Sequence, residues 1–163
     1  MADQPDTSSA HLLRHTVATL AYRAGKALRG APPEFEQFRV APDTRTPVEI
    51  LAHIGDLLDW AAALADGRNH WHSSQPLPWD AEVERFFLAL TNLDQRLASG
   101  PPLAAEMQRL FSGPIADALT HTGQISLLRR IAGSPVKGEN YFKAEIATGR
   151  VGKDQAEPVR EFD

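Results

Sequence analysis

Apolar residues recur along most of the chain at intervals of three and four positions, which is the period of an amphipathic helix. The clearest stripes predict a first helix over about 9–29 and a third helix over about 80–98. Their apolar positions are Leu13, Val17, Leu20, Ala24, Ala27 and Leu28 in the first, and Val83, Phe86, Leu90, Leu93 and Leu97 in the third. Almost no segment alternates with the two-residue period of a strand. The sequence therefore predicts an all-α protein.

Capping residues and prolines predict where the other helices begin and end. Thr46 is a suitable N-cap before a proline, and it predicts a second helix that runs to about Asp66. After a break at Gly100-Pro-Pro102, a short helix is expected to end near Phe111, before a second break at Ser112-Gly-Pro114. A fourth long helix is expected over about 114–132, with Gly133 as its C-terminal stop.

A last short helix is expected over about 139–148, with a polar tail from Gly149. Four long helices with short additional ones predict a four-helix bundle. We expect a single domain over 1–163, with its core over about 9–150 and polar tails at both ends.

Composition narrows the classes of function. The net charge is −4, and no basic cluster exceeds Arg129-Arg130, so nucleic acid is not an expected partner. The absence of cysteine excludes disulfides, thiolate zinc sites and cysteine nucleophiles. The first ten residues lack the regions of a signal peptide, and no apolar run has membrane-spanning length. We therefore predict a cytoplasmic protein with no membrane partner.

Polar residues fall on the predicted core face of two helices. A helical wheel places His53 among apolar residues of the second helix, which are Ile50, Leu57, Trp60 and Leu64. In the fourth helix Asp117, His121 and Gln124 share a face with two apolar residues, Leu128 and Ile131. The opposite face holds Thr122, Ser126, Arg129 and Arg130. Asp117 and His121 are four positions apart, so their side chains can converge on one point.

A divalent metal ion would satisfy these buried polar groups together. Burial of a polar group without a partner costs roughly 2–7 kcal/mol. Imidazole and carboxylate ligands suit zinc, nickel or ferrous iron, and the three ligands His53, Asp117 and His121 leave positions open for water or substrate. Such an ion could make a bound water nucleophilic or activate a thiol substrate. Gln124 is placed to hydrogen-bond to His121 behind the metal.

Each residue also has a simpler interpretation. His53 could be a buried histidine with a hydrogen-bonded partner. Asp117 could interact favourably with the dipole of its helix, because it lies in the first turn. Gln124 could be a buried amide bonded to the backbone. His70 and His72 flank a tryptophan in a loop and are expected to be surface side chains. Two arginines, Arg129 and Arg130, either bind an anionic substrate or interact with the helix C-terminus.

Short motifs resemble the DinB-like (YfiT-type) superfamily over most of the chain. They are Ile50-Leu-Ala-His-Ile54, His121-Thr-Gly-Gln-Ile125, Leu127-Leu-Arg-Arg-Ile-Ala-Gly133 and Asn140-Tyr-Phe-Lys-Ala144. The resemblance implies a four-helix bundle that holds a divalent metal, usually through three histidines, and that is often a homodimer. It maps His53 and His121 onto two of those ligands, whereas Asp117 stands where the family has histidine. Relatives include transferases that use low-molecular-weight thiols.

Two hypotheses follow from the sequence. The first is a metal-binding DinB-like protein, a metal-dependent transferase or hydrolase that acts on a small molecule. The second is a non-catalytic bundle that binds a ligand or partner and contains His53, Asp117 and His121 as a buried polar network. No general acid or base can be named beyond a metal-bound water, so whether the protein is an enzyme stays open.

Overall fold

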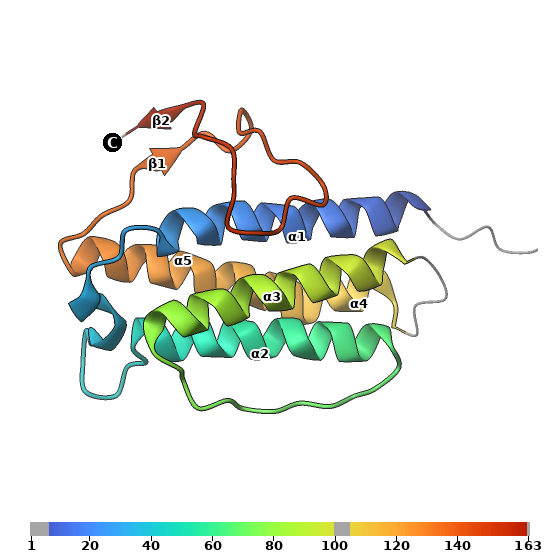
Figure 1. Ribbon diagram of the computed structural model, residues 1–163, viewed down its shortest axis with the longest axis horizontal. Helices are drawn as coiled ribbons and strands as arrows, with labels where there is room; N and C mark the ends of the chain where they lie inside the picture. The colour runs from blue at the N-terminus through green and yellow to red at the C-terminus, as the bar shows by residue number, and fades with distance from the viewer. Residues whose placement is uncertain (1–6, 100–104, 163) are drawn as a thin grey trace, which may run out of the picture.

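The computed structural model describes residues 7–99 and 105–162, and four helical rods dominate it (Figure 1). The first three rods are α1 (Thr7–Leu28), α2 (Pro47–Ala65) and α3 (Trp79–Ala98). The fourth consists of α4 (Met107–Leu110), the π-helical turn η2 (Phe111–Ile115) and α5 (Ala116–Ile131). Smaller elements are the 3-10 helix η1 (Pro33–Gln37) and the paired strands β1 (Gly138–Glu139) and β2 (Glu161–Phe162). The predicted all-α class is confirmed, with that two-stranded ladder as an addition.

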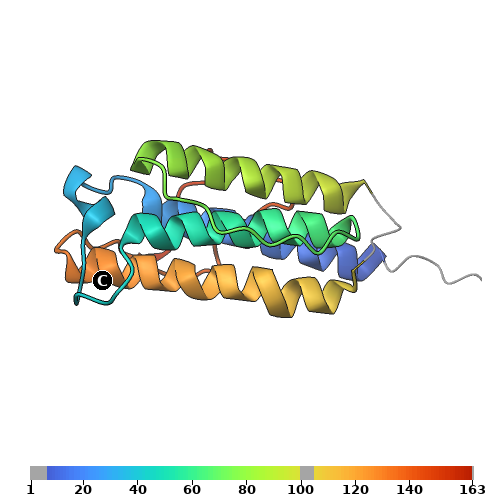
Figure 2. The same ribbon diagram turned by 90° about the horizontal axis from the view of Figure 1, so that it is seen from below.

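The rods pack side by side in an order that differs from their order in the chain. Both α1 and α2 contact α3 and α5, so α1 and α2 lie diagonally across the core. Figure 1 shows that α2 and α3 run in the same direction, whereas α1 and the fourth rod run the opposite way. Parallel neighbours cannot be joined by a tight turn, so the connection over 66–78 returns along α2, which spans about 28 Å. Figure 2 shows this connection lying along the outside of the bundle.

The predicted apolar stripes of α1 and α3 form much of the core. In α1, Leu13, Val17, Leu20, Ala24, Ala27 and Leu28 are all buried. In α3, Phe86, Leu90, Leu93 and Leu97 are buried, and Val83 packs against the core from its edge. Because each stripe is continuous and apolar, its helix has one orientation that removes the stripe from water.

Helix α2 begins as the sequence predicts. The side chain of Thr46 accepts a hydrogen bond from the backbone N–H of Glu49, and the Glu49 carboxylate accepts one from the backbone N–H of Thr46 (2.6 Å). This reciprocal pair is a capping box, and Pro47 occupies the first helical position, where no N–H is needed. The predicted N-cap is confirmed.

The fourth rod is continuous where the sequence predicts a break at Ser112-Gly-Pro114. Leu110 and Ala116, on either side of the π-helical turn, both have right-handed helical backbone angles. Pro114 has no N–H for a regular helical hydrogen bond, and the wider π turn accommodates its ring without ending the helix. The predicted break is therefore wrong. The other predicted break, at 100–102, lies outside the described residues, as do the first six residues of the amino-terminal tail.

The buried face of α5 also differs from the predicted one. Gln124 is exposed and His121 only half-buried, whereas Thr122 and Arg129 are buried, so the predicted orientation of this helix is wrong. The Thr122 hydroxyl donates to the carbonyl of Ala118 (2.9 Å). The Arg129 guanidinium donates to main-chain carbonyls at the end of α1 and after α5, those of Ala27, Arg29, Gly30 and Ser134. Since these hydrogen bonds satisfy both polar side chains, the helix buries them together with Ala118, Ile125 and Leu128.

The segment after α5 is held against α1 rather than forming the predicted helix over 139–148. Glu139 belongs to β1, and its carboxylate accepts hydrogen bonds from the Tyr22 hydroxyl (2.7 Å) and from Lys26 Nζ (2.9 Å). Those tertiary contacts outweigh the local helical tendency of the segment, so this predicted helix is wrong. The residues after Gly149, which the sequence describes as a polar tail, fold back over the bundle and bury Val151.

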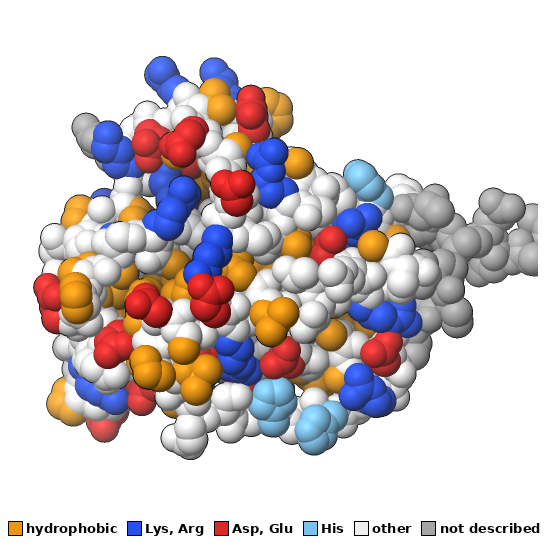
Figure 3. All heavy atoms as spheres, in the orientation of Figure 1, with side chains coloured by type: hydrophobic (Ala, Val, Ile, Leu, Met, Phe, Trp, Pro, Cys, Tyr) orange, Lys and Arg blue, Asp and Glu red, His pale blue; other side chains and the backbone are white. Residues whose placement is uncertain are grey.

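Charged side chains of both signs are interspersed over the molecular face drawn in Figure 3. None of the helices in the described part of the chain combines the length and apolar composition needed to cross a membrane.

Candidate metal centre

Three predicted ligand residues meet where α2 packs against α5. His53 projects from α2, and Asp117 and His121 project from the first two turns of α5. His53 Nε2 lies 3.7 Å from one oxygen of Asp117, and His121 Nε2 lies 3.4 Å from the other. The two imidazole rings are 4.8 Å apart between centroids and nearly perpendicular. The sequence places the potential ligands only along each helix separately. The structure brings the ligands of the two helices together.

The spacing of these atoms fits a small divalent ion. Ligands about 2.1 Å from a tetrahedral ion stand roughly 3.4 Å from one another. One ligand atom from each of His53, Asp117 and His121 lies within 4.8 Å of the others, so a modest closure of the side chains is enough to surround an ion. Among the described residues, no lysine or arginine lies within ion-pair distance of Asp117, so a cation would not have to displace one.

The group lies at the edge of the core rather than inside it. The side chains of His53 and His121 are 21% and 14% exposed, and that of Asp117 is 47% exposed. The sequence predicts that all three are buried on core-facing stripes, and this part of the prediction is wrong. The phase of α5 differs from the predicted one, and the buried face of α2 centres on Ile54 and Leu58 rather than on His53. Consequently an ion here would be reachable from solvent.

Gln124 orients His121. Its side-chain oxygen lies 2.7 Å from His121 Nδ1. Because an amide oxygen only accepts, a neutral His121 in this contact carries its proton on Nδ1, which leaves the lone pair of Nε2 on the side of Asp117. A ring held in this tautomer by a neighbour is the usual arrangement of metal-binding histidines. The predicted contact between Gln124 and His121 is therefore present, although Gln124 is exposed rather than buried.

His53 is favoured in its neutral form. Burial lowers the pKa of His53 below its ordinary value of 6.5, and the positive charges of His121 and Arg45 lower it further. Asp117 and Asp56 act in the opposite direction, with smaller effects. A neutral imidazole is the form that can donate its lone pair to a metal ion.

Acid should therefore weaken the metal-free protein before its carboxylates titrate. Above pH 6.5 the imidazole of His53 is neutral in both the folded and the unfolded state and contributes nothing to the pH dependence. Below that pH the unfolded state takes up the proton more readily, so the free energy of unfolding should fall as the pH falls through 6.5 toward the lower folded-state pKa. Urea unfolding at pH values between about 7.5 and 5 measures this fall. The range extends from about one unit above the ordinary pKa of 6.5 to about one and a half units below it.

The matched control for this measurement is the variant His53→Ala, in which the part of the slope due to His53 should disappear. An NMR titration that finds the pKa of His53 at or above 6.5 in the metal-free protein would contradict the prediction.

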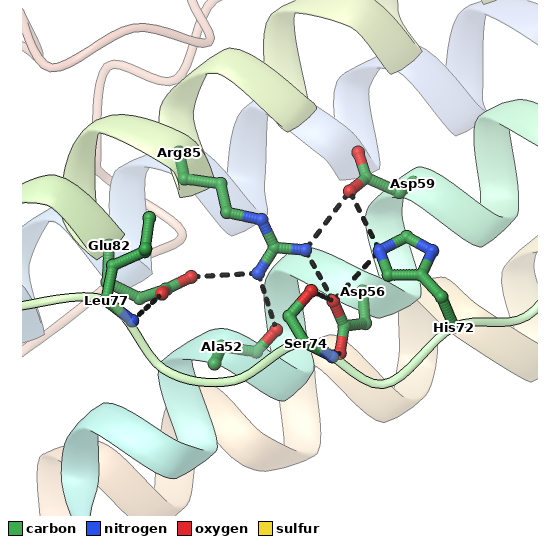
Figure 4. A network of polar contacts seen from close by, with 8 residues as sticks. All are labelled: Ala52, Asp56, Asp59, His72, Ser74, Leu77, Glu82 and Arg85. Carbon is green, nitrogen blue, oxygen red and sulfur yellow. Dashed lines mark hydrogen bonds and ion pairs between the residues drawn. The ribbon is translucent and has the colours of Figure 1, made fainter.

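A second polar cluster, which the sequence does not predict, lies where α2 meets α3 and the loop that follows α2 (Figure 4). His72 Nε2 lies 3.2 Å from Asp56 and 3.7 Å from Asp59, and Arg85 of α3 pairs with both carboxylates. The backbone N–H and the hydroxyl of Ser74 donate to Asp56 at 2.9 and 2.7 Å. Burial alone would raise the pKa of Asp56, but the hydrogen bonds from Ser74 and Arg85 outweigh it and hold that pKa below its ordinary value of 3.8.

This second cluster also has the composition of a metal site. Ligand atoms of Asp56, Asp59 and His72 lie within 4.8 Å of one another. However, the Arg85 guanidinium already supplies the cation, with one nitrogen shared by Asp56 and Asp59 and the other bonded to Glu82 (2.9 Å). A metal ion would have to displace it, which makes the group of His53, Asp117 and His121 the better candidate.

Two signals in the sequence could have pointed to the second cluster. The first is Gly55, a glycine in the middle of a long helix, where a Cβ atom would lie 2.9 Å from Nη1 of Arg85. The second is the spacing of Asp56 and Asp59, which puts two carboxylates on adjacent turns of α2. His72, expected at the surface, is half-buried because its loop returns along this helix.

Comparisons with protein-family models, with curated proteins and with solved structures found no match to the chain.

Proposed function

We propose that the protein binds a divalent metal ion through His53, Asp117 and His121, as a member of the DinB-like bundles. The observation that supports the proposal most directly is the donor set itself, with two imidazole nitrogens 3.4 and 3.7 Å from the oxygens of one partly exposed carboxylate. Two histidines and one carboxylate suit zinc, and they also suit ferrous iron or nickel.

The residues around the ion would leave room for a reaction. Three protein ligands leave at least one coordination position open, and the half-exposed Asp117 faces solvent. When bound, a divalent ion supplies Lewis acidity, which lowers the pKa of a coordinated water or thiol. Gln124 would keep His121 in the ligating tautomer, and the lowered pKa of His53 would keep that ring deprotonated. This arrangement supports a transferase or hydrolase that acts on a small molecule, with a low-molecular-weight thiol as one substrate.

Metal analysis of protein purified without a polyhistidine tag tests the proposal. We expect one equivalent of divalent ion per chain, and we expect zinc or nickel to raise the melting temperature. His53→Ala and His121→Ala should each weaken binding by about a hundredfold or more, equivalent to about 2.7 kcal/mol, because each removes one of three protein ligands.

His70→Ala is the matched control, because His70 is an exposed histidine of the same chain that belongs to neither cluster. Wild-type affinity in the His53 and His121 variants would show that the ligands are elsewhere. If zinc and nickel neither bind nor stabilise the wild-type protein, the metal proposal is wrong.

In that case the second candidate function applies, a non-catalytic bundle in which these residues form a polar network. The ion-pair distances between Asp117 and the two histidines are the observation in its favour. Homodimer formation and a cytoplasmic location remain predictions from the sequence; size-exclusion chromatography with light scattering tests the first.

A further inference from the structure

Carboxylate side chains of the helices accept hydrogen bonds from backbone N–H groups along the connection between α2 and α3. The backbone N–H of Ser74 donates to Asp56 (2.9 Å), and that of Leu77 donates to Glu82 (2.9 Å). At the start of α3, the N–H of Trp79 donates to Glu36 of η1 (2.9 Å). An extended loop on the surface usually gives such groups to water. Here each acceptor is a charged side chain of a helix, so the position of the loop is specified.

Arg85 makes this arrangement possible. Its guanidinium neutralises Asp56 and Glu82, the two carboxylates that accept from the loop, and it also donates to the carbonyl of Ala52 (3.2 Å). His72 of the loop reaches the same carboxylate, Asp56, at 3.2 Å. Figure 4 shows the guanidinium between α3 and the loop residues, with Asp56 at the centre. Thus one buried charge network sets where residues 72–77 lie.

Trp71, next to His72, lies directly against the candidate metal ligand His53. The two rings meet edge to face with centroids 5.7 Å apart, so the ring of His53 contacts both Trp71 and His121. Trp71 also packs edge to face on Trp60 (5.7 Å), whose indole N–H donates to Asn69 of the loop (3.0 Å). Trp71 is 42% exposed, so the indole covers part of His53 at the protein surface.

We propose that Trp71 limits access to the metal ion and that Asp56, His72, Ser74 and Arg85 act as positioning residues that hold Trp71 against His53. The access role rests on the proposed metal site, whereas the placement of Trp71 does not. Asp56 of the network and the candidate ligand His53 both belong to α2 and are three positions apart, so the loop that binds Asp56 has a fixed reference to His53. An indole in contact with one ligand restricts both the approach of exogenous ligands and the rotation of that imidazole.

The placement is tested in the metal-free protein by NMR. The ring current of Trp71 displaces the chemical shifts of the His53 ring protons, and Trp71→Ala should abolish that displacement. The double variant His72→Ala/Ser74→Ala should reduce it as well, because it removes two side chains that bind Asp56 while keeping Arg85 in place. The variant His72→Gln/Ser74→Thr, which retains a donor at each position, should restore it.

His70→Ala serves as the control within the same loop and should leave the His53 shifts unchanged. Global destabilisation would not move these shifts in the folded protein, so the readout separates positioning from stability. Wild-type His53 shifts in the folded His72→Ala/Ser74→Ala variant would overturn the positioning role.

The access role is tested with Co²⁺ as the bound ion. Release of Co²⁺ to an excess of chelator should be about tenfold faster in Trp71→Ala and in His72→Ala/Ser74→Ala than in the wild-type protein, the size expected for loss of one aromatic contact. Release from His70→Ala should match the wild type. Equal release rates for the wild type and Trp71→Ala would overturn the access role. Absence of Co²⁺ binding in the wild-type protein would overturn it together with the proposed function, whereas the NMR result would still decide the placement.

Discussion

Arg85→Met should lower the free energy of unfolding by about 3–5 kcal/mol, the cost of breaking a buried ion pair by removal of one partner. Asp56 is 3% exposed and Glu82 is fully buried, and Arg85 is the cation that neutralises both. Methionine fills much of the same space, so the loss comes mainly from two buried carboxylates that no longer have a counter-ion. Asp56 keeps two hydrogen bonds from Ser74, and Glu82 keeps one from Leu77, which favours the lower end of the range.

Urea unfolding of this variant beside Arg109→Met provides the measurement and its control. Arg109 is 82% exposed, and within residues 7–99 and 105–162 it pairs only with Glu106 one turn away, so its replacement should change the free energy of unfolding by less than about 0.5 kcal/mol. Adding Glu82→Gln to Arg85→Met should recover part of the loss, because the variant then buries one charge fewer. Equal effects of the Arg85 and Arg109 substitutions would show that the network in Figure 4 does not stabilise the fold.

Lys26→Met should lower the free energy of unfolding by about 3 kcal/mol, because it also removes the cation that pairs with a buried carboxylate. Lys26 Nζ lies 2.9 Å from Glu139, whose side chain is fully buried, and 2.8 Å from Glu161. After the substitution Glu139 retains only the hydroxyl of Tyr22 as a hydrogen-bond donor among the described side chains. Since both glutamates belong to the paired strands, β1 and β2 should lose their protection against hydrogen exchange before the helices do.

The pH dependence of this variant gives a second test. Burial lowers the pKa of Lys26, but the hydrogen bonds and charges of Glu161 and Glu139 outweigh it, and the pKa lies above its ordinary value of 10.5. The stabilisation is therefore complete below pH 10.5 and is lost as the pH rises through the folded-state value. Lys26→Met should lack this alkaline loss, whereas Lys143→Met, at an exposed lysine, should keep it. Identical alkaline unfolding of wild type and Lys26→Met would contradict the assignment.

Some features of the candidate metal site follow from the sequence of one helix, and others depend on how the helices pack. Asp117 and His121 are one helical turn apart, so their proximity follows from the sequence as soon as the segment is a helix. The proximity of His53 to these two residues depends on how α2 packs against α5. A helical wheel of either helix alone does not predict that packing. The degree of burial was predicted wrongly for the same reason, because exposure depends on which neighbouring helix covers a face.

Helix α5 illustrates why its orientation could not be predicted. Its apolar residues, Leu119, Ile125, Leu127, Leu128 and Ile131, are spread around the helix and define no single stripe. The orientation is decided instead by the buried side chains of Thr122 and Arg129, which find hydrogen-bond acceptors within the fold. Acceptors for Arg129 at the end of α1 are about a hundred positions away in the chain, at separations of 99–102 residues.

By itself, the sequence determined what depends on neighbours within one or two turns. It determined the all-α class, the apolar stripes of α1 and α3, the capping box at Thr46 and the end of α5 at Gly133, whose φ of +79° suits glycine. Only the tertiary structure decided the course of the loop over 66–78, the strand at Glu139 and the meeting of His53 with Asp117 and His121. These features depend on charged and aromatic partners that are distant in the chain, and their energies exist only once the helices have packed.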